Sequence, residues 1–156
     1  MNYVARLLQK YSLYQTRVTS DGDTFSFVIL NPNQNSDIVV DNTSGFENEL
    51  TFYFSYQHAH FGENINALME YIDLFLTDTS AAIEFFQNGE RSFGGDISLH
   101  GIDLLSIDYI SRKFGYKPSY LVGLSYKVRT WSGGNDLDAI IVEEGGHAAC
   151  KKTKLQ

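Results

Sequence analysis

The sequence is poor in cysteine and proline, and each scarcity excludes a class of protein. Its 156 residues include one cysteine, Cys150, so no disulfide can form within the chain. A small secreted domain held together by disulfides is therefore excluded. The presence of only two prolines also argues against a proline-rich linker or a largely disordered chain.

Long apolar segments are missing as well. No apolar run approaches the roughly 18 residues that a membrane-spanning helix requires. The first residues also lack the charged and apolar regions of a signal peptide. These features predict a soluble, cytoplasmic protein that does not use a membrane. The hydrophobic content of 43% is enough to bury a core without disulfides or metal.

Positive charge is absent from almost half of the chain. Residues 18–90 contain no lysine or arginine, yet they hold 12 of the 19 acids of a chain whose net charge is −7. These acids are Asp21, Asp23, Asp37, Asp41, Glu47, Glu49, Glu63, Glu70, Asp73, Asp78, Glu84 and Glu90. Such a block should repel nucleic acid and attract cations or basic proteins. The alternative is a solvated acidic surface that only promotes solubility.

Hydrophobic periodicity predicts strands interrupted by a few helices. Strands are expected at residues 14–19, 25–30, 37–41, 49–61, 81–87, 91–97, 120–131 and 137–143. The main amphipathic helix is expected at about 63–77, with minor helices at 2–13 and within 99–114. Asn88-Gly89 predicts a tight hairpin turn. The pattern indicates one α+β domain over residues 1–150, mostly antiparallel sheet, followed by a frayed basic tail at 151–156.

Two segments of this pattern are central to the functional interpretation. If residues 49–61 form one strand, its period of two places His58 and His60 on the same face as Phe52 and Phe54. In the helix that follows, the side opposite the apolar stripe collects Glu63, Asn66, Glu70, Asp73 and Thr77. Leu74 falls within this acidic side. A leucine surrounded by carboxylates is typical of a binding surface with an apolar anchor and a charged rim.

The pattern His58-Ala-His60 has two interpretations. Two histidines at this spacing on a strand could supply two ligands to a transition metal. A third ligand would have to come from Glu63, His100 or His147. The alternative is that both imidazoles simply pack within the fold. No nucleophile motif and no phosphate-binding loop is present, so a binding protein without a cofactor is expected rather than an enzyme.

Trp131 and the residues around it form a second local pattern. The only tryptophan lies at the predicted end of a strand, where it could fill the core or anchor an interface. Thr130-Trp131-Ser132-Gly133 with Asp136 nearby, together with His58-Ala-His60-Phe61, resembles a family of small bacterial cytoplasmic proteins. Several proteins of that family are regarded as immunity proteins of polymorphic toxin systems. The resemblance implies that the motif positions are His58, His60, Trp131 and Asp136.

The sequence therefore leads to one favoured hypothesis and two alternatives. The favoured function is a non-enzymatic acidic binding module, of the immunity type, that neutralises a basic toxin domain. The partner-binding residues are then Glu63, Asn66, Glu70, Asp73 and Leu74. One alternative is a metal-dependent enzyme that uses His58 and His60 as ligands. The other is a structural or oligomeric subunit without a separate partner.

Overall fold

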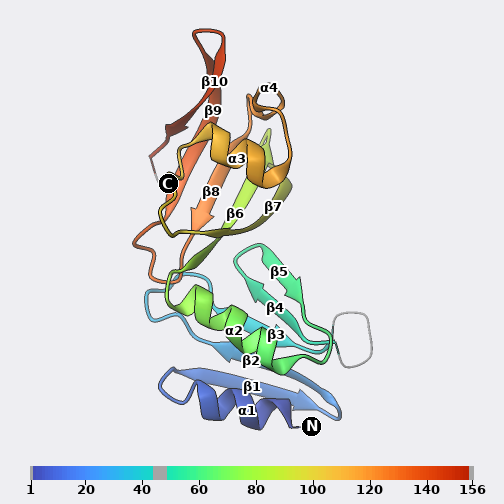
Figure 1. Cartoon of the computed structure of the whole chain (residues 1–156). Helices are drawn as coiled ribbons and strands as arrows, with labels where there is room; N and C mark the ends of the chain where they lie inside the picture. The colour runs from blue at the N-terminus through green and yellow to red at the C-terminus, as the bar shows by residue number, and fades with distance from the viewer. Residues whose placement is uncertain (1, 44–48, 155–156) are drawn as a thin grey trace. The chain divides into compact units, whose positions relative to one another are not determined.

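The computed structural model describes residues 2–43 and 49–154, which form two compact units (Figure 1). Unit 1 consists of residues 1–78 and 131–133, and unit 2 consists of residues 79–130 and 134–156. The single domain over residues 1–150 that the sequence predicts stays a prediction, and the two units are described separately below. The predicted fold class is confirmed, because each unit is a five-stranded antiparallel sheet with helices.

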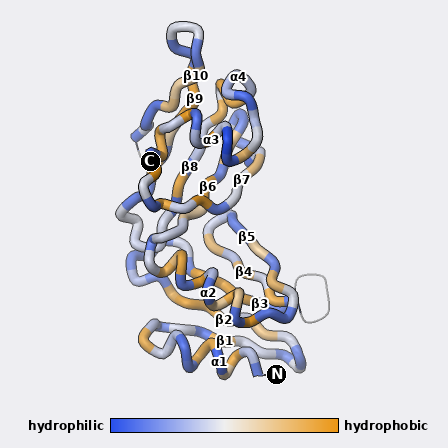
Figure 2. Tube along the Cα trace, viewed as in Figure 1, coloured by the Kyte–Doolittle hydropathy of each residue, from blue (hydrophilic) through white to orange (hydrophobic). Residues whose placement is uncertain are grey.

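Unit 1 is an antiparallel meander in the order β1-β2-β3-β4-β5. Its elements are α1 (Tyr3–Lys10), β1 (Thr16–Asp21), β2 (Thr24–Ile29), β3 (Ile38–Asp41), β4 (Thr51–Phe54), β5 (Gln57–His60) and α2 (Ile65–Leu76). Every strand pairs with the one before it in an antiparallel manner, and the connections within β1–β2 and β4–β5 are two-residue turns. Figure 2 shows the apolar colouring of β2 and β3 within this unit.

Both helices of unit 1 pack on the same face of its sheet. The ring centroid of Tyr11, the residue that caps the C-terminal end of α1, lies 6.3 Å from that of Phe27 on β2. Phe75 of α2 lies 5.0 Å from Phe52 of β4. Phe27 and Phe52 are both cross-strand partners of Val40, so the two aromatic contacts are made on one face. The two helices therefore lie side by side on the sheet.

Asparagine caps set the start of both helices. The side chain of Asn2 accepts a hydrogen bond from the backbone N–H of Ala5, and the side chain of Asn64 accepts one from Ala67. Asparagine is favoured at this position because its side-chain oxygen satisfies a backbone N–H that has no partner within the helix. Helix α2 therefore begins at Ile65, and Glu63 lies just before it rather than in its first turn.

The predicted strand over residues 49–61 is wrong, because this segment folds into a hairpin. Phe54 pairs with Gln57, which leaves Ser55 and Tyr56 as a two-residue turn, with Ser55 at a φ of 54°. The turn reverses the alternation of faces. His58 pairs with Tyr53 and His60 with Thr51, so both histidines lie on the face opposite Phe52. The turn has no glycine, asparagine or proline, and so the usual sequence signal is missing.

Unit 2 has the strand order β10-β9-β8-β6-β7. Its elements are β6 (Ser80–Gln87), β7 (Glu90–Ser98), α3 (Ile107–Phe114), α4 (Pro118–Leu121), β8 (Ser125–Arg129), β9 (Leu137–Glu144) and β10 (His147–Lys152). The predicted hairpin at Asn88-Gly89 is confirmed, since both turn residues have positive φ. The helices pack on one face of the sheet, where Ile110 and Leu121 join its buried cluster.

Strand β10 corrects the prediction of a frayed tail that begins at residue 151. Lys151 and Lys152 pair with Ile140 and Ala139 of β9, so they belong to the sheet. Gly145 and Gly146 form a hairpin turn, where the sequence suggested the end of the last strand. The alternation in β10 is weak because its residues are small or charged, and this explains why periodicity did not reveal it.

Candidate functional site

The two units differ sharply in charge. Unit 1 contains three lysine or arginine residues and ten acids, a net charge of −7. Unit 2 contains nine of each, a net charge of zero. The whole net charge of the protein is therefore carried by unit 1. An electrostatic field of one sign on a compact unit attracts oppositely charged partners over several ångströms. Unit 1 is therefore the candidate for a binding surface.

The last two acids of the predicted block, Glu84 and Glu90, belong to unit 2. Glu84 on β6 is only 2% exposed, and its Oε2 lies 2.6 Å from Nε of Arg91. Gly94 on β7 makes room for it, since an added Cβ there would lie 2.6 Å from the same oxygen. Glu84 is thus a buried, paired carboxylate. Glu47, another member of the block, lies outside the described residues.

The acidic side of α2 divides into an outer and an inner part. Glu63, Glu70 and Leu74 are exposed, with 40% of Leu74 open to solvent. Asn66 and Asp73 use their side-chain oxygens to contact helix α1, although Asn66 is also exposed. The predicted binding face of five residues is therefore not uniformly available. We use "outer α2 surface" for Glu63, Glu70 and Leu74.

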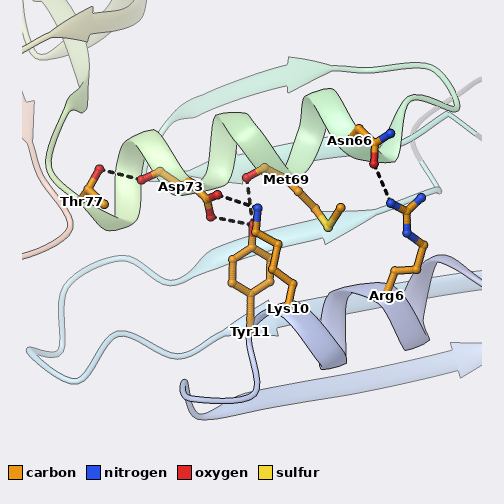
Figure 3. A network of polar contacts seen from close by, with 7 residues as sticks. All are labelled: Arg6, Lys10, Tyr11, Asn66, Met69, Asp73 and Thr77. Atoms are coloured by element: carbon orange, nitrogen blue, oxygen red, sulfur yellow. Dashed lines mark hydrogen bonds and ion pairs between the residues drawn. The ribbon is translucent and has the colours of Figure 1, made fainter.

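Helix α1 holds the inner part through a set of polar contacts (Figure 3). Arg6 Nη2 donates to Asn66 Oδ1 at 2.6 Å, and Lys10 Nζ pairs with Asp73 Oδ2 at 2.6 Å. The hydroxyl of Tyr11 lies 3.0 Å from the carbonyl oxygen of Met69 and 3.1 Å from Asp73 Oδ1. Arg6 and Lys10, two of the three cations of unit 1, thus both contact α2.

Tyr11 is the buried member of this network. Only 2% of the residue is exposed. Burial, followed by the nearby charge of Asp73, raises the pKa of the Tyr11 phenol well above its ordinary value. The phenol therefore remains protonated and serves as a hydrogen-bond donor to α2. No sequence signal could link residues 11 and 73, because they meet only after both helices pack on the sheet.

A polar cavity of about 710 Å³ adjoins the N-terminal end of α1. Asp23 of the β1–β2 turn and Glu63 line it, together with the rings of Tyr3 and Phe25, whose centroids lie 6.4 Å apart. The described residues that line the cavity include no lysine or arginine. Glu63 thus belongs both to the outer α2 surface and to the lining of the cavity that it shares with Asp23.

His58 and His60 lie close together on β5, with ring centroids 5.3 Å apart. His60 Nδ1 is 3.3 Å from Glu49 Oε2 and 3.3 Å from Thr51 Oγ1. Across the described part of the chain, no three His, Cys, Asp or Glu side chains are grouped so that they could hold a metal ion. Both histidines are exposed rather than packed in the core. The expectation that they continue an apolar face is therefore wrong.

Trp131 and Asp136 have structural surroundings. Trp131 is 6% exposed, its ring lies 6.4 Å from that of Phe54, and its carbonyl oxygen accepts from Asn31 Nδ2 at 2.9 Å. Asp136 Oδ1 accepts from the backbone N–H and the hydroxyl of Thr130, at 2.8 and 3.0 Å. Trp131 thus fills the core of unit 1, and Asp136 closes the turn that follows β8.

Comparison of the chain with models of known protein families, with curated proteins and with solved structures yielded no match. Among the described residues, no helix is both long and apolar enough to cross a membrane. The geometry and the charge of the two units are therefore the basis on which a function can be argued.

Proposed function

We propose that the protein is a binding module that uses the outer α2 surface to engage a basic protein, of the kind presented by a toxin domain that an immunity protein neutralises. The observation that carries this proposal is the concentration of the whole net charge of −7 in unit 1. Complementary charge mainly accelerates the encounter between two proteins, and the asymmetry directs the partner to one unit.

In this proposal, Leu74 and the neighbouring acids contribute to different steps of binding. Glu63 and Glu70 remain in contact with solvent, so they act at long range and guide the approach of the partner. Leu74 is exposed one turn after Glu70 and loses its contact with water when the complex forms. Asn66 and Asp73 act indirectly, because their contacts with α1 fix the position of the helix.

The experiment is a kinetic study of binding to the toxin domain encoded beside the gene, or to a captured partner if no toxin gene is adjacent. Association should slow as salt rises, because the Debye length falls from about 8 Å at physiological ionic strength to about 3 Å at 1 M. Glu63→Lys and Glu70→Lys should slow association and weaken its salt dependence. Leu74→Ala should instead accelerate dissociation.

A matched control is available in unit 2. Glu90 is an exposed acid that belongs to the same block by sequence but to the neutral unit by structure. Glu90→Lys should therefore leave association nearly unchanged. If association proves independent of salt and is affected equally by Glu70→Lys and Glu90→Lys, the proposal fails and the acids of unit 1 serve only solubility.

A further inference from the structure

Unit 2 carries a surface whose chemistry is the reverse of the outer α2 surface. Residues 109–135 contain five lysines or arginines and no acid. Two of these cations, Lys127 and Arg129, lie on β8, where each interacts with another side chain of unit 2. Arg129 pairs with Asp138 at 2.6 Å, and Lys127 lies over the ring of Phe86. The other three, Arg112, Lys113 and Lys117, are exposed at the junction of α3 and α4.

Two exposed tyrosines lie among these cations. Tyr116 is 44% exposed and Tyr120 is 72% exposed. We use "basic corner" for the set formed by Arg112, Lys113, Tyr116, Lys117 and Tyr120. Tyrosine and arginine are the residue types enriched in protein interfaces, where a ring supplies contact area at a small cost in side-chain entropy.

The basic corner is held in a defined conformation. Gly115 ends α3 in the left-handed conformation at a φ of 73°, which redirects the chain. The ring of Tyr116 then packs against that of Phe93 in a tilted arrangement, with centroids 4.9 Å apart. Ser111 Oγ donates to the carbonyl oxygen of Tyr116 at 2.6 Å. The corner is thus ordered before it binds anything, which lowers the cost of binding.

The cations of the basic corner differ from the four cations that form ion pairs within the chain. Lys10, Arg91, Arg129 and Lys151 each form an ion pair with a carboxylate. Within residues 2–43 and 49–154, Arg112, Lys113 and Lys117 pair with no carboxylate. One acid, Glu143, lines a cavity of about 600 Å³ beside Lys117 without pairing with it. The corner therefore presents three exposed cations without a carboxylate partner among the described residues, with Asp108 one turn before Arg112 on α3.

We propose that the basic corner docks onto the outer α2 surface of a second copy of this chain. The charges are complementary, since Glu63 and Glu70 would face Lys113 and Lys117. Leu74 would lie against the exposed tyrosine rings, so each copy would bury an apolar group that is open to solvent in the single chain. A second copy is favoured over a nucleic acid because unit 1, with its charge of −7, repels phosphates.

This inference rests on the proposed function, because the same acidic surface is used. The contact joins two different surfaces, so it is heterologous, and repeated contacts of this kind build a ring or an open filament. A basic partner and a second copy would then compete for the outer α2 surface. Self-association would cover the outer α2 surface until the basic partner displaces the second copy.

Sedimentation velocity of the full chain over a range of concentrations tests the inference. Two double variants are needed: Lys113→Ala with Lys117→Ala, and Glu63→Gln with Glu70→Gln. The wild-type protein should show a mass that rises with concentration at low salt and returns to that of one chain at about 1 M salt, where screening is strongest. Each double variant alone should associate at least about tenfold more weakly, equivalent to about 1.4 kcal/mol.

Mixing the two variants gives the sharper result. One variant keeps the acidic surface and the other keeps the basic corner, so an equimolar mixture should form a complex of two chains and no larger species. A control, Lys152→Ala with Lys154→Ala, removes two exposed lysines of unit 2 outside the corner and should associate like the wild type.

The outcomes separate this inference from the proposed function. A wild-type protein that stays monomeric at every concentration, or a Lys113/Lys117 variant that associates normally, overturns the inference and leaves the binding of a basic partner untouched. Binding of oligothymidylate that is lost in the Lys113/Lys117 variant would assign the corner to nucleic acid and would also overturn it. Self-association without any effect of the outer α2 surface on partner kinetics would count against the proposed function alone.

Discussion

At the scale of single residues, Trp131 shows how the structure decides between the core role and the interface role that the sequence allows. The sequence places it at the end of a strand beside glycines, where either role is possible. In the structure it is 6% exposed and packs near Phe54. Its backbone carbonyl is held by Asn31, a residue 100 positions earlier in the chain. Trp131 is therefore buried by residues that are distant in the sequence, such as Asn31 and Phe54.

We predict that Trp131→Ala lowers the free energy of unfolding by about 3–5 kcal/mol, because it removes a large buried ring and leaves a cavity. Chemical denaturation measures this loss. Tyr120→Ala is the matched control, since Tyr120 is 72% exposed and its removal should cost less than about 0.5 kcal/mol. A Trp131→Ala protein that folds normally and loses only its partner would return the residue to the role of interface anchor.

The burial of Tyr11 leads to a prediction about how the free energy of unfolding depends on pH. Burial, together with Asp73, raises the pKa of its phenol in the folded state, whereas in the unfolded chain the phenol titrates near its ordinary value of about 10. Above that pH the unfolded chain loses the proton first, so the free energy of unfolding falls as pH rises. The stabilisation is fully present below about pH 10.

Tyr11→Phe tests this account. At neutral pH the variant should be less stable by about 1–2 kcal/mol, because the hydrogen bonds to α2 are lost. Above about pH 10 its stability should decline less steeply than that of the wild type. Some decline should remain, because burial also raises the pKa of Tyr126. Denaturant titrations between pH 7 and about 11 make the comparison, and parallel curves for the two proteins would contradict it.

At the scale of secondary-structure elements, the pairing of α1 with α2 decides which acids are available. Both helices are amphipathic by sequence, and both place their apolar residues against the sheet, as periodicity predicts. Their polar sides then meet at an angle that the sequence does not specify. Asp73 turns toward Lys10 and Tyr11, while Glu70, one turn earlier, stays in solvent.

We predict that two identical charge reversals on α2 differ in their effect on stability. Asp73→Lys removes the partner of Lys10 and Tyr11 and places two cations side by side, which should cost about 1–3 kcal/mol. Glu70→Lys should cost less than about 0.5 kcal/mol. Most of the difference comes from Tyr11, because Lys10 and Asp73 are 35% and 45% exposed and such an ion pair contributes little.

A second variant keeps this prediction specific. The combination of Lys10→Glu with Asp73→Lys restores opposite charges and should recover part of the loss, as chemical denaturation of the three variants would show. Equal costs for Asp73→Lys and Glu70→Lys would mean that the contacts between α1 and α2 do not persist in solution.

At the scale of the whole molecule, the important feature is the boundary between the units. The sequence shows a block of acids that ends at Glu90, but the structural boundary falls at residue 78 and the chain returns to unit 1 at residues 131–133. The block is therefore divided, and its last two acids lie in a unit whose charges balance. The asymmetry between the units is sharper than the distribution along the sequence.

Periodicity and turn chemistry by themselves determined the α+β class, the antiparallel arrangement, helix α2 and the hairpin at Asn88-Gly89, because these depend on residues that are neighbours in the chain. They did not determine the turn at Ser55 and Tyr56, where the backbone adopts a positive φ without glycine. They did not predict strand β10 either, because its pairing with β9 rather than its own composition makes it a strand.

The tertiary structure alone decided which acids form a surface. Whether a carboxylate is free, paired or buried depends on groups brought to it from elsewhere, such as Lys10 at Asp73 and Arg91 at Glu84. It also divided the chain into a charged and a neutral unit and assembled the basic corner at the turn between α3 and α4. The physical reason is that electrostatic interactions act through space, while sequence patterns report only order along the chain.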